Sequence, residues 1–194
     1  MDFKKHLETA WQLTLKFIVP LILMTLVMFV VSCVTLGILA PVTMAGYMQA
    51  ILLMLRDGRE PRIQDLFSQM KLFLPLLGFG IVVFIVIIIG FMLLVLPGII
   101  VALAISFSCL YMLPLMTDKE MGLIDAIKKS YAMARQGAIM DHIVVMLLFM
   151  GISGIGGSIF IGWLFTQPLA TVFLLSAYEE KTTQTPHDQP ITEK

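Results

Sequence analysis

Charged side chains divide this chain into three long apolar blocks. Residues 17–55, 72–117 and 142–178 contain no Asp, Glu, Lys or Arg. A membrane-spanning helix needs about 20 apolar residues, so each block is long enough for two spans and too long for one. Because backbone groups in lipid must be hydrogen-bonded within their own element, helices are the expected structure. The pattern predicts an all-α integral membrane protein with six transmembrane helices.

Each apolar block also carries a break near its middle. The first block has LGILAP around Gly37, and the second has LVLPGI around Pro97. The third block has several glycines between 151 and 157, followed by Pro168. Proline lacks an amide donor and glycine favours turns, so these sites predict the tips of three helical hairpins. For the third tip we favour a turn at 154–157 with a kink at Pro168; the alternative is that Pro168 starts the last helix.

Short segments with helical periodicity precede the three hairpins. Apolar residues recur at helical spacing after Phe3, after Ile63 and within residues 118–137. The segment after Ile63 follows Pro61, which is a favourable residue in the first turn of a helix. Amphipathic helices of this kind lie in the headgroup region with their apolar face towards the lipid. We therefore expect three interfacial helices, all on one side of the membrane.

The stretch DKEMGLIDAIKKSYAMARQG, residues 118–137, is dense in charge although only 13% of the whole chain is charged. We expect Thr117 or Asp118 to cap its helix and Gly137 to end it. Its apolar face comprises Ile124, Ile127, Tyr131 and Ala134. The opposite face carries the candidate docking residues for a partner, which are Asp125, Lys128, Lys129 and Arg135. We expect Asp125 to pair with one of the two lysines.

The basic residues give the orientation. All 13 Lys and Arg lie outside the predicted hairpin tips, so three hairpins would place all of them on one side. Basic residues in short loops stay in the cytoplasm, which predicts that both termini are cytoplasmic. The formal net charge of zero does not alter this, because the rule counts Lys and Arg only. The tail at 181–194 is polar and contains prolines, and we expect it to be disordered.

The charged segments recur at a spacing of about 60 residues, and such a period is typical of repeat architectures. FKKHLETAW begins at Phe3, IQDLFSQMK at Ile63 and LIDAIKKSY at Leu123. One polytopic domain, residues 1–180, would then consist of repeat units at about 2–60, 61–120 and 121–180. Identity between the copies is weak and membrane helices resemble one another in composition, so a chance similarity is the alternative.

A longer segment, LPGIIVALAISFSCLYMLPLMTDKEMGLIDAIKKSYAMARQG, resembles the recurring pattern of a bacterial integral membrane superfamily. That superfamily includes the membrane domain attached to some glycerophosphodiester phosphodiesterases. The matching residues are Pro97, Gly98, Asp125, Ala126, Ile127, Lys128, Ser130, Arg135 and Gly137. The resemblance covers about residues 90–150 and implies a multi-pass protein of a bacterial cytoplasmic (inner) membrane. It implies no chemistry, because the reaction of those enzymes belongs to a separate soluble domain.

Catalytic and metal-binding motifs are not found in the sequence. His6, His142 and His187 have no partner at the spacing of metal ligands. Cys33 and Cys109 lie inside predicted spans, where a structural disulfide is not expected. We therefore expect a non-catalytic protein without a cofactor, a metal or a nucleic-acid partner. Its expected partners are membrane lipids and another membrane or cytoplasmic protein; the sequence leaves its oligomeric state open.

Two sets of polar residues within the blocks support alternative functions. A small-molecule or lipid transporter or channel would need a polar cavity at mid-membrane, for which the candidates are Tyr47, Gln49, Ser106 and Gln167. Broken helices and repeats are frequent in transporters, but hydroxyl and amide groups also serve helix packing in lipid. Asp141 and His142 begin the fifth span and would suit a proton relay. The relay is the weaker interpretation, because no partner group accompanies them and both are expected at the headgroup level.

Overall fold

A computed structural model describes residues 3–93, 95–135, 139–157 and 160–184 of the chain. All regular elements within these ranges are helices, as the all-α prediction requires. In chain order they are α1 (Phe3–Lys16), α2 (Ile18–Val34), α3 (Ala40–Asp57), the 3-10 helices η1 (Ile63–Phe67) and η2 (Met70–Leu72), α4 (Phe73–Leu93), α5 (Val95–Cys109), α6 (Met112–Asp118), α7 (Leu123–Arg135), α8 (Ile139–Gly157) and α9 (Phe160–Gln184).

Two of the helical stretches are long and apolar enough to cross a membrane. They run over Ile63–Met92 and Gly98–Asp118. Two further candidates are pairs of helices joined at a sharp bend, with 87° between α1 and α2 and 113° between α7 and α8. The described part of the chain therefore has two to four candidate spans. The count of six, the three hairpins and the three-fold repeat stay predictions.

The first two helix breaks fall close to the predicted positions. α2 and α3 are joined by a turn in which Leu36 and Gly37 have positive φ values of 50° and 82°. The second break comes earlier than predicted, because Pro97 and Gly98 already lie inside α5. Gly98 serves a close approach instead: a Cβ atom there would lie 2.8 Å from Cγ of Phe91 in α4. Only glycine allows these two helices to come so near.

The last helix differs in two respects from the sequence expectation. α8 continues through the residues predicted as a turn, 154–157, so that prediction is wrong; residues 158 and 159, which follow, lie outside the described residues. Pro168 lies inside α9 and does not start that helix, which agrees with the favoured interpretation. α9 also continues to Gln184, so the first four residues of the predicted disordered tail, 181–184, are helical. The rest of that tail lies outside the described residues.

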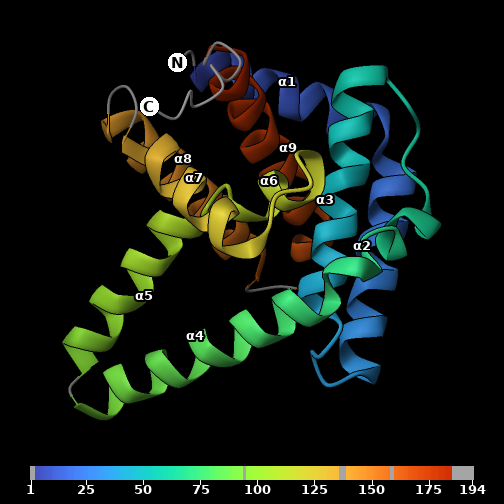
Figure 1. Cartoon of the computed structure of the whole chain (residues 1–194). Helices are drawn as coiled ribbons and strands as arrows, with labels where there is room; N and C mark the ends of the chain where they lie inside the picture. Colours follow the sequence, from blue (N-terminus) through green and yellow to red (C-terminus); the bar gives the residue numbers. More distant parts are fainter. Residues whose placement is uncertain (1–2, 94, 136–138, 158–159, 185–194) are drawn as a thin grey trace, which may run out of the picture.

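The helices form a packed bundle from which one arm projects. α4 and α5 make a V-shaped arm that extends away from the other helices (Figure 1). Most side chains of α4 are exposed and apolar, including Ile81, Val82, Phe84, Ile85, Ile88 and Ile89. A helix that is apolar all round is typical of a membrane span rather than of a solvent-facing element.

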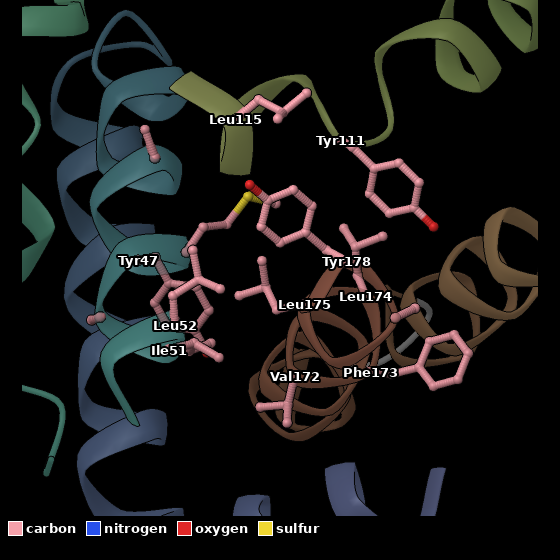
Figure 2. Packing of buried hydrophobic residues seen from close by; sticks show 14 of the residues in the cluster. Tyr47, Ile51, Leu52, Tyr111, Leu115, Val172, Phe173, Leu174, Leu175 and Tyr178 are labelled. Atoms are coloured by element: carbon pink, nitrogen blue, oxygen red, sulfur yellow. The ribbon is translucent and has the colours of Figure 1, made fainter. Parts of the chain in front are cut away.

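α9 occupies the centre of the bundle, in contact with α1, α2, α3 and α8. Its consecutive side chains Val172, Phe173, Leu174 and Leu175 are all buried. Figure 2 shows them pointing to different sides of the helix, with Tyr47, Ile51 and Leu52 of α3 on one side. Because 3.6 residues complete one turn, burial of four consecutive positions means that neighbours surround α9.

The segment after Ile63 is not the amphipathic α-helix that its spacing predicts. It forms the short turns η1 and η2, and within η1 only Leu66 is buried. The backbone of η1 lies directly against α3, where a Cβ atom on Gly46 would be 2.3 Å from the Leu66 carbonyl oxygen. This close approach, together with the Arg62 amide donating to the Asp65 carboxylate at 3.0 Å, fixes η1 as a tight turn.

Candidate functional site

Four consecutive residues near the end of α9 join this helix to the surrounding elements. They are Tyr178, Glu179, Glu180 and Lys181, here called the α9 hub. Each step along an α-helix turns by about 100°, so four successive side chains point to nearly all sides. The hub follows the long uncharged block directly, which places its charges where the chain leaves the apolar region.

The first half of the hub completes an ion-pair network with α3 and α6. Arg56 donates from Nη2 to Oδ2 of Asp118 at 3.0 Å, pairs through Nη1 with the second oxygen, and donates from Nε to Glu179 at 2.7 Å. The Tyr178 hydroxyl donates to Oδ2 of Asp118 at 3.1 Å. Lys119 Nζ lies 3.7 Å from the same carboxylate, so two cations meet two anions. This balance matters because the Asp118 side chain is only 4% exposed, and buried charges are stable only when paired.

The second half of the hub holds α1 and α7. His6 of α1 hydrogen-bonds through Nδ1 to the Ser176 hydroxyl at 2.7 Å and pairs through Nε2 with Glu180. Lys181 donates to the Met133 carbonyl oxygen of α7 at 3.1 Å. Burial lowers the pKa of the Lys181 ammonium, and the nearby carboxylate of Asp141 in α8 opposes that change. One turn of α9 thus interacts with residues of five other helices, α1, α3, α6, α7 and α8.

The relay candidates Asp141 and His142 lie beside different neighbours. Asp141 is half-buried beside Lys181, whereas the His142 side chain is completely buried rather than at the surface. His142 contacts Phe107 and Tyr111 edge to face, with ring centroids 4.5 Å and 5.3 Å apart. The contacts of His142 are thus with α5 and the start of α6, whereas Asp141 lies near Lys181 of α9; the proton relay stays a prediction.

His142 has a structural role at the break between α5 and α6. In an unbroken helix the Tyr111 amide would donate to the Phe107 carbonyl oxygen. Here the Tyr111 amide donates to the Ser130 hydroxyl at 3.1 Å, and His142 Nε2 donates to the Phe107 oxygen at 2.9 Å. Side chains from α7 and α8 thus satisfy both backbone groups that the break releases, as buried backbone groups require.

The predicted cavity residues are not joined to one another. Tyr47 shares a hydrogen bond of 3.2 Å with Thr25 of α2, and Gln167 donates to the Met44 sulfur at 3.6 Å. Gln49 and Ser106 lie on α3 and α5. Within the described residues no hydrogen bond links any two of the four candidates. Tyr47 and Gln167 instead use their polar groups in helix packing, which is the usual role of such groups in membrane bundles.

The candidate docking residues lie on a helix that starts later than predicted. α7 begins at Leu123, and the predicted caps Thr117 and Asp118 end α6 instead; Gly137 lies outside the described residues. Asp125, Lys128 and Arg135 are exposed and Lys129 is half-buried. The predicted pairing of Asp125 with a lysine does not occur among the described residues.

Two acidic residues of the same stretch form ion pairs with other parts of the chain. Asp118 belongs to the hub network, and Glu120 pairs with Lys71 of η2. That ion pair lowers the pKa of the Glu120 carboxyl. α7 itself therefore carries three cations and one anion, and Lys129 is the half-buried one of the four.

α1 and α7 both turn large apolar side chains outwards. α1 buries His6, Ala10 and Thr14 against the bundle and exposes Leu7, Trp11 and Leu15 one position along. α7 buries Ala126, Ser130, Met133 and Ala134, while Ile124 and Tyr131 of the predicted apolar face are exposed. Arg135 covers the Tyr131 ring with its guanidinium 5.6 Å from the centroid. Each helix packs with its small and polar side and presents its apolar side to the surroundings.

Metal chemistry has no support in the described residues, which contain no cluster of three His, Cys, Asp or Glu side chains. Cys33 and Cys109 are both free thiols.

Comparisons with protein-family models, curated proteins and solved structures gave no match to this chain. Sequence reasoning missed the α9 hub, although three consecutive charged residues, 179–181, directly after an uncharged block of two-span length were a visible signal.

Proposed function

We propose that this chain is a non-catalytic, multi-pass protein of a bacterial inner membrane that organises lipid through α1 and α7. In this proposal six helices cross the membrane, both termini are cytoplasmic, and α1 and α7 lie in the cytoplasmic headgroup layer. The resemblance over residues 90–150 is part of the proposal, because it implies the same location and no chemistry.

The outward apolar side of α1 is the single observation that carries the proposal. A helix of a soluble protein turns Leu7, Trp11 and Leu15 inwards and its polar groups outwards. α1 exposes these three apolar residues together with its charged ones, and it buries the polar residues His6 and Thr14. The acyl boundary of a membrane provides an apolar partner for such a side, and tryptophan is a preferred residue at that depth.

The charges of α7 favour lipid over a protein as the partner of this helix. Each Lys or Arg near an anionic membrane surface contributes about 1 kcal/mol of attraction. Within α7, Asp125 alone offsets Lys128, Lys129 and Arg135, and the preceding acids Asp118 and Glu120 are each paired with a cation. Docking of another membrane or cytoplasmic protein on the same face is the competing form of the proposal.

Fluorescence of Trp11 tests the proposal directly. The chain has two tryptophans, so Trp163→Phe leaves Trp11 as the only one, and the replacement keeps an aromatic ring against Phe29. In reconstituted vesicles we expect quenching of Trp11 by lipids brominated near the headgroup and weak quenching by acrylamide in the water. The matched variant Trp11→Phe reports Trp163 alone. Efficient acrylamide quenching of Trp11 without lipid quenching would refute an interfacial α1.

The transporter or channel remains the second candidate, and one observation favours it. The break between α5 and α6 is held open by side chains from two other helices, and broken helices line substrate sites in many transporters. A transporter predicts solute flux in vesicles that disappears when the clamp residues His142 and Ser130 are replaced. The lipid-organising function predicts no such flux.

A further inference from the structure

A groove of about 390 Å³ lies between the first turns of α2 and the segment 60–64. One wall is apolar and includes Val19 and Leu23, which are largely exposed to the surroundings of the bundle. The other wall is polar and includes Glu60, Arg62 and Gln64. The volume is within the range of about 300–1,000 Å³ that small-molecule sites occupy.

The groove carries two opposite charges, Glu60 and Arg62, that form no ion pair with the described part of the chain. Within the described residues, neither the Glu60 carboxylate nor the Arg62 guanidinium takes part in an ion pair. Asp65, three positions after Arg62, is already paired with Arg59 at 2.5 Å. Asp65 instead accepts from the Arg62 backbone amide, which fixes the main chain and leaves the guanidinium open.

The spacing of these two charges is fixed by the chain between them. Pro61 separates Glu60 from Arg62, and its ring restricts the backbone at that position. Pro61 is also buried, so the loop is anchored against the bundle. A cation and an anion, two positions apart in the chain, thus line the same groove as the apolar wall.

The ligand that complements this arrangement carries a phosphate, an ammonium group and a hydrocarbon chain. A guanidinium binds phosphate oxygens through several donors in a fixed plane. A carboxylate binds a primary ammonium with hydrogen bonds, which a quaternary ammonium cannot donate. Val19, with 73% of its surface exposed, and Leu23 would contact an acyl chain. The bend between α1 and α2 places this groove where the interfacial helix meets the first span.

We infer that the groove binds one phospholipid with a primary-amine zwitterionic headgroup, of the phosphatidylethanolamine type. Arg62 contacts its phosphate, Glu60 its ammonium group, and the α2 wall its acyl chain. This inference rests on the proposed function, because it requires α1 and the start of α2 to lie at the headgroup level.

Lipid retention by the intact purified protein tests the inference. The protein is placed in nanodiscs with equal amounts of phosphatidylethanolamine, phosphatidylcholine and phosphatidylglycerol of identical acyl chains, and native mass spectrometry identifies the lipids that remain bound. We expect a preference of about two- to fivefold for the ethanolamine lipid over the choline lipid, the range that an exposed ion pair provides. Glu60→Gln should remove this preference, and Arg62→Gln should lower retention of all three lipids.

Control variants separate the groove from general charge effects. Glu8→Gln and Lys4→Gln alter an exposed ion pair on α1 and should leave the preference unchanged. Equal retention of the three lipids by the unaltered protein, or a preference that survives Glu60→Gln, would overturn the inference. Loss of the preference with Trp11 still quenched by lipid refutes the groove alone, whereas Trp11 in water refutes the proposed function.

Discussion

Arg56 and Asp118, 62 positions apart in the sequence, form a two-pronged ion pair at the point where α3, α6 and α9 meet. Glu179 and Tyr178 of α9 complete the network from the other side. The pair therefore ties the ends of three apolar segments to one level. If these segments cross a membrane, that level is where the chain enters the cytoplasmic interface, and α1 and α7 lie beside it.

Asp118→Asn tests the contribution of this pair to stability. We expect a loss of about 2 kcal/mol in the free energy of unfolding, below the ~3–5 kcal/mol of fully buried pairs. The smaller value follows because Arg56 is 36% exposed and keeps Glu179. Glu8→Gln, in an exposed pair on α1, should change stability by less than about 0.5 kcal/mol. Thermal unfolding in detergent measures both variants, and equal effects would contradict a special role for the Arg56–Asp118 pair.

Gly46→Ala tests the close approach of η1 to α3. The new methyl group would meet the backbone carbonyl oxygens of Leu66 and Asp65 at 2.3 Å and 2.5 Å, so η1 must move away. We expect a loss of about 2–3 kcal/mol, at the upper end of overpacking effects, and faster hydrogen exchange across 63–72. The control is Gly80→Ala in α4, where nothing lies within 4 Å and alanine should stabilise the helix by up to about 1 kcal/mol. Similar results for the two variants would show that η1 does not rest on α3.

A double-mutant cycle tests the clamp at the α5–α6 break. His142→Leu leaves the Phe107 carbonyl without a partner and Ser130→Ala leaves the Tyr111 amide without one, each at a cost of about 1–3 kcal/mol. In the double variant these two backbone groups are free to bond to each other, which restores the continuous helix. The double variant should therefore lose at least about 1 kcal/mol less than the sum of the single losses. Additive losses would mean that the break does not depend on these side chains.

Reversal of the α7 lysines separates lipid attraction from protein docking. In the variant Lys128→Glu with Lys129→Glu, we expect α7 to leave membranes that contain anionic lipid, because about 1 kcal/mol is lost for each basic residue. An added Ile124→Trp reports this as a red shift of its emission, and Asp125→Asn should shift the emission in the opposite direction. An unchanged emission together with loss of a co-purifying protein would favour the docking form of the proposal.

The helices α1 and α7 and the first break follow from local pattern, and so they could be predicted. The spacing of Leu7, Trp11 and Leu15 depends only on α1 itself, and the positive φ at Gly37 depends only on its turn. η1 could not be predicted, because its shape depends on the absence of a side chain at Gly46 in another helix. The spacing of Ile63, Leu66 and Phe67 is equally compatible with an α-helix.

The α9 hub depends on contacts between distant parts of the chain. Glu179 and Arg56 are 123 positions apart, and Glu180 and His6 are 174 apart. No periodicity within a segment carries that information. The same reason explains why α7 exposes Ile124: the buried side is chosen by the small residues Ala126 and Ser130, which allow α7 to approach its neighbours closely. Apolar spacing alone cannot distinguish a side that faces protein from one that faces lipid.

Labelling of single cysteines in intact cells tests most directly whether the charged face, which is the side that carries Arg59, Lys128 and the α9 hub, is cytoplasmic. The background replaces both native cysteines, Cys33 and Cys109, by alanine. Leu36, which is 90% exposed in the turn between α2 and α3, is compared with Arg59 and Lys128 on the charged face. With both termini in the cytoplasm, we expect a membrane-impermeant thiol reagent to label Leu36→Cys from outside. It should label Arg59→Cys and Lys128→Cys only after the cells are permeabilised. Labelling of Arg59→Cys or Lys128→Cys from outside, with Leu36→Cys protected, would contradict this topology.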